Sequence, residues 1–241
     1  MSETHDETSS SLPLNVFTTA VPAPLASRRH TIRFLLIVCG IAFIGVLQTR
    51  QASVASHPSR VLLYLSLAGL QLLFVWFVRL GIRARKHSIL DLFGKRWSSW
   101  KDATRDIILG VLFVVVLRVC SELLQHLLGR PFANVAFLLP HNLAESVLWT
   151  GVATIAGICE EIVYRGYLQP QLWALSRSLP LSIAMQAIIF GAAHAYQGWR
   201  PALITAVYGV AFGLLVAWRK SIIPGAIAHS LIDIIGGLLR R

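Results

Sequence analysis

Seven separate apolar segments divide this chain, and each approaches the roughly 20 residues that an α-helix needs to cross a lipid bilayer. They cover residues 31–48, 61–78, 107–124, 143–168, 179–195, 202–218 and 222–239. Hydrophobic residues make up 55% of the 241 residues and charged residues only 14%, whereas a soluble domain carries about 25% charged residues. Backbone polar groups in lipid must be satisfied within the protein, which favours helices. The sequence therefore predicts an all-α fold, a polytopic transmembrane bundle of about seven to eight helices.

The N-terminal region differs from the rest of the chain. Residues 1–30 are mostly polar and include the serine run 9–11, with no apolar core of the signal-peptide type. A segment of this composition cannot bury enough apolar surface to fold alone. We predict a disordered polar tail over residues 1–30 and a single transmembrane helical domain over residues 31–241.

The basic charge is explained by a membrane. The formal net charge is +11, but the Lys and Arg residues flank apolar segments, where they bind anionic lipid headgroups. We therefore expect the lipid bilayer as a partner and no nucleic acid. The most basic loop lies between residues 79 and 105, and basic loops stay in the cytoplasm. This predicts a multi-pass protein of the plasma membrane with a cytoplasmic N-terminus.

Two adjacent carboxylates interrupt the fourth apolar segment. Glu160 and Glu161 follow fourteen residues that otherwise suit a membrane helix, and Arg165 comes one turn later. A charge at the bilayer centre costs roughly 2.5–3.5 kcal/mol on insertion scales. At i,i+4 spacing Glu161 can pair with Arg165. Glu160 points about 100° away on a helix, so we expect it to meet a group from another helix.

Two later segments supply histidines that suit this role. His194 ends the fifth segment, and His229 lies in the seventh with Asp233 one turn further on. Histidine is the usual general acid or base near neutral pH and a common metal ligand. Glu160 with His194 could activate a water molecule, and a carboxylate at Asp233 could hold the tautomer of His229.

Each feature taken alone has a structural explanation. A histidine near a helix end is often interfacial, and Glu161 with Arg165 could be a packing ion pair. Arg118 and Glu122 in the third segment are also spaced i,i+4, and we predict that they pair for structural reasons. The occurrence of polar residues on three separate apolar segments favours a functional site.

The positions and order of these residues resemble the CPBP intramembrane proteases, the CAAX-protease and bacteriocin-processing (Abi) family. That family carries EExxxR on one helix, FxxxH on the next and HxxxN or a variant on a later one. The matching motifs are Glu160-Glu161-Ile-Val-Tyr-Arg165, Phe190-Gly-Ala-Ala-His194 and His229-Ser-Leu-Ile-Asp233. The resemblance covers roughly residues 105–237, which we take as the catalytic core.

The resemblance implies an endopeptidase that hydrolyses membrane-associated peptides or proteins, including prenylated or precursor peptides. Glu160 and His194 would activate water, Glu161 and Arg165 would support the site, and His229 with residue 233 would stabilise the oxyanion. This chain has Asp233 where the family often has Asn, and an ionised Asp cannot donate to an oxyanion. We therefore expect Asp233 to orient His229.

Metal dependence has two readings. The family has been described as metalloproteases, and Glu160, His194 and His229 could supply three ligands of an open zinc site. The chain lacks HExxH, which would place two ligands and a base on one helix. We expect no required cofactor, with zinc as the alternative.

Two further functions fit the same residues. In a proton-coupled transporter, Glu160, His194 and His229 would form a proton relay. A non-hydrolytic bacteriocin-immunity or binding protein could keep the fold without the activity. Loss of cleavage on Glu160→Gln would separate the protease from both.

The protease requires the two histidines to reach one depth. His194 lies near the end of its segment and His229 near the start of a parallel one. At about 1.5 Å per residue their depths would differ by more than about 10 Å. We predict that the apolar loop 222–225 enters the membrane and carries His229 with it.

Overall fold

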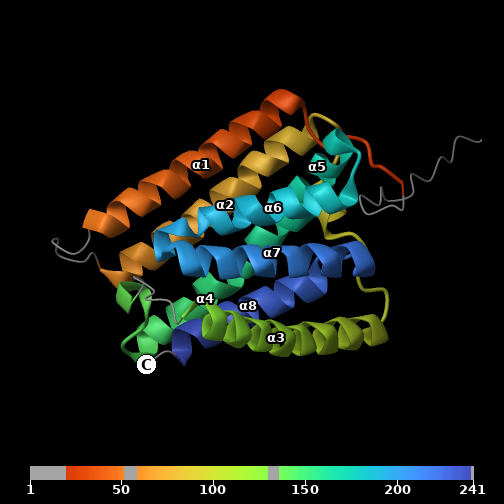
Figure 1. The fold of residues 1–241 in the computed structure, drawn as a ribbon. Coiled ribbons are helices and arrows are strands. Elements are labelled where there is room, and N and C mark those ends of the chain that lie inside the picture. The colour runs from red at the N-terminus through yellow and green to blue at the C-terminus, as the bar shows by residue number, and fades with distance from the viewer. Residues whose placement is uncertain (1–19, 52–58, 130–135, 240–241) are drawn as a thin grey trace, which may run out of the picture.

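The computed structural model describes residues 20–51, 59–129 and 136–239, and helices account for the fold within them (Figure 1). The α-helices are α1 Arg28–Gln51, α2 Arg60–Arg83, α3 Trp100–Leu128, α4 Leu143–Glu160, α5 Gln169–Ser176, α6 Leu179–Ala193, α7 Trp199–Arg219 and α8 Ile223–Leu238. A π-helix, Glu161–Leu168, joins α4 to α5, and short 3-10 helices lie at Ile89–Phe93, Ala136–Leu138 and Ala195–Gln197. No strand occurs in the described ranges. The predicted all-α bundle is confirmed.

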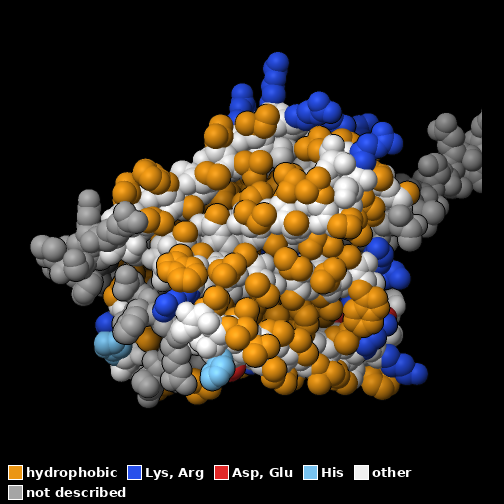
Figure 2. All heavy atoms as spheres, in the orientation of Figure 1, with side chains coloured by type: hydrophobic (Ala, Val, Ile, Leu, Met, Phe, Trp, Pro, Cys, Tyr) orange, Lys and Arg blue, Asp and Glu red, His pale blue; other side chains and the backbone are white. Residues whose placement is uncertain are grey.

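The helices have the lengths of a multi-pass membrane protein. Among the described residues, five runs are long and apolar enough to cross a bilayer: Arg28–Thr49, Arg60–Arg83, Trp100–Leu128, Leu143–Ser176 and Trp199–Arg219. The apolar helices α6 and α8 are shorter. Figure 2 shows hydrophobic side chains spread over the visible face of the bundle, with Lys and Arg near its edges. Such an apolar exterior suits lipid rather than water.

Helix α4 occupies the middle of the bundle. It contacts α2 on one side and α8 on another, while α6 packs on α7 and α3 packs on α8 (Figure 1). The π-helix that continues α4 contributes residues 162–164, 167 and 168 to the main buried core. The position of α4 brings the Glu160-Glu161 pair into the interior.

The N-terminal end of the described chain is held against α5. The backbone N–H groups of Leu25 and Ala26 donate to Gln171 Oε1 at 2.7 and 3.1 Å, and both residues are buried. The predicted tail 1–30 therefore differs at its end, since these residues are packed and α1 begins at Arg28. The rest of that prediction, residues 1–19, lies outside the described residues.

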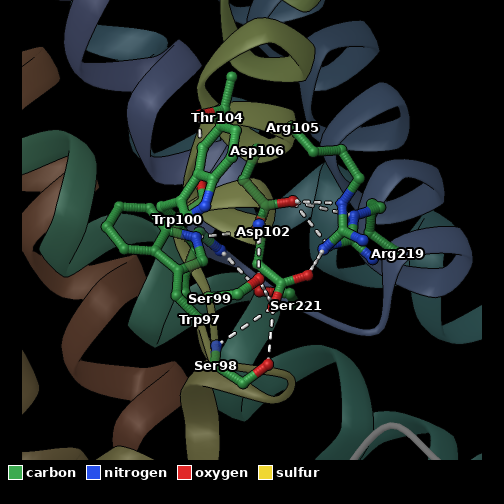
Figure 3. Close-up of polar contacts among 11 residues, drawn as sticks. Trp97, Ser98, Ser99, Trp100, Asp102, Thr104, Arg105, Asp106, Arg219 and Ser221 are labelled. Atoms are coloured by element: carbon green, nitrogen blue, oxygen red, sulfur yellow. Dashed lines mark hydrogen bonds and ion pairs between the residues drawn. The ribbon is translucent and has the colours of Figure 1, made fainter.

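A buried ion pair joins α3 to α7 at one end of the bundle (Figure 3). Asp106 is 1% exposed, and its Oδ1 atom lies 2.6 Å from Arg219 Nη2. Trp97 Nε1 donates to the other oxygen of Asp106 at 3.1 Å, and Arg105 Nε reaches Oδ1 at 3.4 Å. We call these four residues the Asp106 cluster. It fixes the start of α3 against the last turn of α7.

The segment that leads into α8 is held next to this cluster. Lys95 N–H donates to Lys220 O at 2.8 Å, and Ile222 N–H donates to Phe93 O at 3.1 Å. Ser221 and Ile222 are fully buried. The start of α8 is therefore determined by pairing with the loop before α3.

The predicted Arg118–Glu122 ion pair is wrong. The two side chains form no ion pair in the structure, although both residues are described. Arg118 lines a cavity, whereas Glu122 does not. A helix spacing of i,i+4 allows a pair but does not require one, because each side chain also chooses between rotamers.

Candidate active site

The two adjacent carboxylates lie where the helix changes its winding. Glu160 is the last residue of α4, and Glu161 begins the π-helix, all eight residues of which are buried. A π-helix closes i→i+5 hydrogen bonds and is often found at functional sites. Its wider turn changes the directions in which Glu161 and Arg165 point, compared with a regular α-helix.

A small residue lets α8 approach this part of α4. A Cβ atom on Gly157 would lie 2.5 Å from the backbone nitrogen of Ser230, which no side chain could tolerate. Ser230 is the neighbour of His229 in sequence. Close contact at Gly157 therefore places His229 beside the carboxylates of the next helical turn.

Glu161 and Arg165 form a fully buried ion pair. Both side chains are 0% exposed, and Oε1 lies 2.8 Å from Nη1. The guanidinium group also lies over the rings of Phe190 and Phe212, at 4.3 and 4.8 Å from their centroids. Cation–π contact of this kind is strongest where water is excluded. The predicted pairing of Glu161 with Arg165 is present, with the two aromatic rings enclosing the charge.

His229 lies between the two carboxylates. Its Nδ1 atom is 3.0 Å from Glu161 Oε1, and its Nε2 atom is 3.6 Å from Glu160 Oε2. A carboxylate oxygen accepts, so Nδ1 carries a proton and donates to Glu161. The ring also stacks on Phe212, with centroids 5.2 Å apart. An imidazole has nitrogens on opposite sides, so it can reach two carboxylates that point in different directions.

Glu160 lines the cavity, and its two carboxylate oxygens have different surroundings. Gln71 Nε2, from α2, donates to Glu160 Oε1 at 2.6 Å. The other oxygen, Oε2, is buried and accepts no hydrogen bond from the described residues. It lies 4.0 Å from His194 Nε2 as well as 3.6 Å from His229 Nε2. Buried polar atoms are normally hydrogen-bonded, so we expect this oxygen to bind a water molecule or a ligand.

His194 is held by the FxxxH motif. It follows α6, and its Nδ1 atom lies 2.8 Å from the backbone oxygen of Phe190. The carbonyl accepts, so Nδ1 is the protonated nitrogen and Nε2 points to Glu160. The Phe190 ring packs edge-on against the rings of both His194 and His229, at 4.8 and 5.7 Å. Phe190 thus separates and positions the two imidazoles.

Asp233 does not make the contact with His229 that the sequence predicted. Its Oδ2 atom lies 3.8 Å from His229 Nε2, too far for a hydrogen bond. The carboxylate that holds the Nδ1 side of His229 is Glu161, from another helix. Asp233 is 36% exposed at its side chain and lines the cavity. The expected orientation of His229 by Asp233 therefore needs correction, because Glu161 makes that hydrogen bond.

A cavity of about 280 Å³ lies over these groups, bounded by parts of α2, α3, α4, α7 and α8. Its wall includes Glu160, His194, His229 and Asp233, so the four predicted catalytic side chains share one space. Glu161 and Arg165 lie behind it. Gln71 also lines this cavity and was missed in the sequence. A lone glutamine inside an apolar segment was the available signal.

The two histidines reach the same carboxylate because α6 is short and the start of α8 is buried. Helix α6 ends at Ala193 after 15 residues. Ser221 and Ile222 are buried beside the loop before α3, and α8 starts directly at Ile223. The predicted entry of loop 222–225 takes the form of a regular helix start enclosed by protein, which avoids unsatisfied backbone in lipid.

The fit of a metal ion depends on the same three donors. Glu160, His194 and His229 converge, but one oxygen of Glu160 is bonded to Gln71. Within the described ranges, no group of three or more His, Cys, Asp or Glu residues has an arrangement that could hold a metal ion. Zinc donors lie about 2.0–2.2 Å from the metal. Three donors at that distance from one ion would lie closer to one another than the 4.0 and 3.6 Å that separate Glu160 Oε2 from the two imidazoles here.

Comparison with known families adds an independent observation. Residues 142–235 match the family described as type II CAAX prenyl endopeptidase Rce1-like. The matched stretch runs from the N-cap of α4 into α8 and contains every predicted site residue from Glu160 to Asp233. No curated protein and no solved structure shows significant similarity to the chain. Residues 142–235, which carry the three motifs, are therefore similar to the Rce1-like CAAX endopeptidases, in agreement with the resemblance to the CPBP family.

Proposed function

We propose that this protein is an intramembrane endopeptidase in which Glu160 activates the attacking water. The observation that carries the proposal is the position of Glu160 Oε2, buried and within 4.0 and 3.6 Å of two imidazole Nε2 atoms. Glu160 also lines a cavity of about 280 Å³. A carboxylate so placed can take a proton from water, and His194 can orient that water.

In the proposed reaction, the water oxygen attacks the carbonyl carbon of the peptide bond while a water proton passes to Glu160. His229 in its protonated form donates from Nε2 to the oxyanion, as its Nδ1 donates to Glu161. Such preorganised donors stabilise the charge that develops in the transition state. The intermediate collapses, the carbon–nitrogen bond breaks, and Glu160 returns the proton to the leaving amine.

The supporting residues keep this arrangement rigid. Glu161 is neutralised by Arg165, so it can hold His229 without leaving an unpaired buried charge. Gln71 donates to one Glu160 oxygen, and the other oxygen accepts no hydrogen bond from the described residues. Asp233 lies close enough to His229 Nε2 to favour its protonated form. We assign Asp233 this electrostatic role at the catalytic site.

We propose that the reaction needs no metal cofactor, since each step uses only these side chains. Zinc held by Glu160, His194 and His229 is the alternative, and it would supply a bound water as nucleophile. The substrates we propose are membrane-associated peptides or proteins, including prenylated ones. The family description and the position of the site among apolar helices support that class.

We also propose that the N-terminus is cytoplasmic and that the protein resides in the plasma membrane. The starts of α1 and α3 and the ends of α2 and α7 lie towards the same end of the bundle (Figure 1). This end carries Arg28, Arg29, Arg83 and Arg219. Basic residues favour the cytoplasmic side.

Peptide cleavage by purified protein tests the activity. Membrane-anchored peptides in lipid nanodiscs should be cut by the wild type and not by Glu160→Gln. The matched control is Glu122→Gln, because Glu122 is exposed on α3 and does not line the cavity. Full biological activity in Glu160→Gln would overturn the proposal in favour of a binding or immunity protein, and proton flux without cleavage would favour a transporter.

A further inference from the structure

A polar stripe lies on the face of α3 that borders the catalytic cavity. Arg118, Ser121 and Gln125 interrupt an otherwise apolar stretch at spacings of three and four residues. This spacing places all three on one face of the helix, and all three line the same cavity as Glu160. Gln125 Nε2 donates to Ser121 Oγ at 2.8 Å, whereas Arg118 makes no hydrogen bond to another described residue.

Arg118 is the charge in this stripe. It lies 18 residues after the start of α3, well inside a helix that could span the membrane. In the described part of the chain it forms no ion pair, and it is the one Arg or Lys residue that lines the cavity. A charged group within the membrane marks a functional site when it faces a polar cavity. An exposed guanidinium there suits an anionic group brought by the substrate.

Aromatic contacts give the position of Arg118 relative to the catalytic imidazole. The ring of Phe113 lies 5.2 Å from that of Phe212, which stacks on His229. Phe113 is thus near the level of His229. Arg118 follows five residues later on α3, which is about 7.5 Å along the axis. An extended peptide covers about 10 Å in three residues, so a group two or three residues from the cleaved bond reaches Arg118.

We propose that Arg118 binds the C-terminal carboxylate of the substrate, two or three residues after the cleaved bond. The inference rests on the proposed endopeptidase function and names the group that sets its cleavage position. A CAAX sequence ends in a free carboxylate three residues after the cysteine that carries the lipid. Arginine suits this role because its planar guanidinium donates two parallel hydrogen bonds to a carboxylate.

The other charges in the cavity favour this direction of binding. Glu160 and Asp233 both line the catalytic part, and they repel a substrate carboxylate there. Arg118 attracts it at the level reached two or three residues further along the chain. The peptide therefore enters with its carboxyl end towards Arg118 and the scissile bond over Glu160. Binding in this direction predicts cleavage at a fixed distance from the chain end, without recognition of each side chain.

Two peptides that differ only at the C-terminus test the proposal. One ends in a free carboxylate and the other in a carboxamide, and both carry the same lipid-modified cysteine. The wild type should cleave the acid more efficiently, by roughly 10- to 100-fold in kcat/KM, because a hydrogen bond to a charged group contributes about 1.5–3 kcal/mol. Arg118→Gln should lose this preference, so that it cleaves the acid and the amide with similar kcat/KM. Arg118→Lys should keep part of it.

The control variant for this experiment is Glu122→Gln. Glu122→Gln, on the same helix one turn away, should keep the full preference for the acid. Equal loss of preference in Glu122→Gln and Arg118→Gln would overturn the proposal and assign Arg118 a structural pairing with Glu122. Cleavage of acid and amide at equal rates by the wild type would also overturn it, with the protease function intact. Absence of any cleavage by the wild type would instead count against the protease itself.

Discussion

Glu161 Oε1 and His229 Nδ1 lie 3.0 Å apart, although 68 residues separate them in the chain. This contact joins the π-helix after α4 to α8 and turns the other imidazole nitrogen towards Glu160. The second of the adjacent glutamates thus serves the site through His229, and the first faces the cavity. The EE pair has a physical explanation, because each carboxylate meets a different side of one ring.

Removing Arg165 should destabilise the protein more than it alters chemistry directly. Arg165→Met leaves the buried Glu161 carboxylate without its counter-charge, and breaking such a pair costs about 3–5 kcal/mol. We expect a marked fall in thermal unfolding temperature, measured in detergent. The double variant Glu161→Gln/Arg165→Met should recover part of that loss. A single variant as stable as the wild type would contradict the buried ion pair.

Gln71 should support catalysis, although it lies outside residues 142–235, the stretch that matches the family. Gln71→Leu removes the donor to Glu160 Oε1, and the loss of a hydrogen bond to a charged group costs about 1.5–3 kcal/mol. We expect kcat to fall by roughly 10- to 100-fold, with a smaller change in KM. The control is Ser66→Ala on the same helix, because Ser66 bonds only to its own helix at Leu62 O. Unchanged kcat in Gln71→Leu would show that α2 is not part of the site.

Gly157 should be intolerant of even one added carbon. A Cβ atom would overlap the backbone of Ser230, so Gly157→Ala must push α4 and α8 apart at the height of the site. Overpacking of this kind costs about 1–3 kcal/mol, and it would move His229 away from Glu160. We expect loss of cleavage in folded protein. Gly151→Ala on the same helix is the control, since nothing lies within 4 Å of its added Cβ, and it should retain activity.

The Asp106 cluster should stabilise the fold without taking part in the reaction. Asp106→Leu leaves Arg219 unpaired and removes the acceptor of Trp97. We expect a loss of about 3–5 kcal/mol in unfolding free energy, and cleavage by the remaining folded protein near the wild-type rate. Thermal unfolding and peptide cleavage at low temperature measure the two effects separately. Catalytic loss without a change in stability would argue against this assignment.

Chelation should leave activity intact, because no proposed step uses a metal ion. Incubation of purified protein with EDTA, followed by removal of the chelator, should give cleavage rates equal to those of untreated protein. Loss of cleavage after EDTA with recovery on zinc addition would support the zinc alternative. The same treatment of Gln71→Leu also separates the metal-free mechanism from the zinc mechanism. In the metal-free mechanism, the lower kcat of Gln71→Leu should not change when zinc is added.

The helices of this protein were predictable from the sequence because hydropathy is a local property. All seven apolar segments correspond to helices in the structure, and the fourth continues through the π-helix into α5. Glu160, His194, His229 and Asp233 were found because charged or polar side chains stand out in an apolar chain. Family motifs then gave their order, and the match over residues 142–235 agrees with them.

Only the tertiary structure decided how these residues meet. Whether Glu161 or Asp233 holds His229, and whether Arg118 pairs with Glu122 or faces the cavity, depends on the rotation and depth of packed helices. The sequence specifies each helix and its polar face, but the contacts between helices depend on close approaches such as Gly157 with Ser230. The change to a π-helix at Glu161 is likewise a feature of the structure that the sequence did not predict. Local patterns determine which residues enter the bundle, and packing determines their partners, because side-chain contacts extend only a few ångströms.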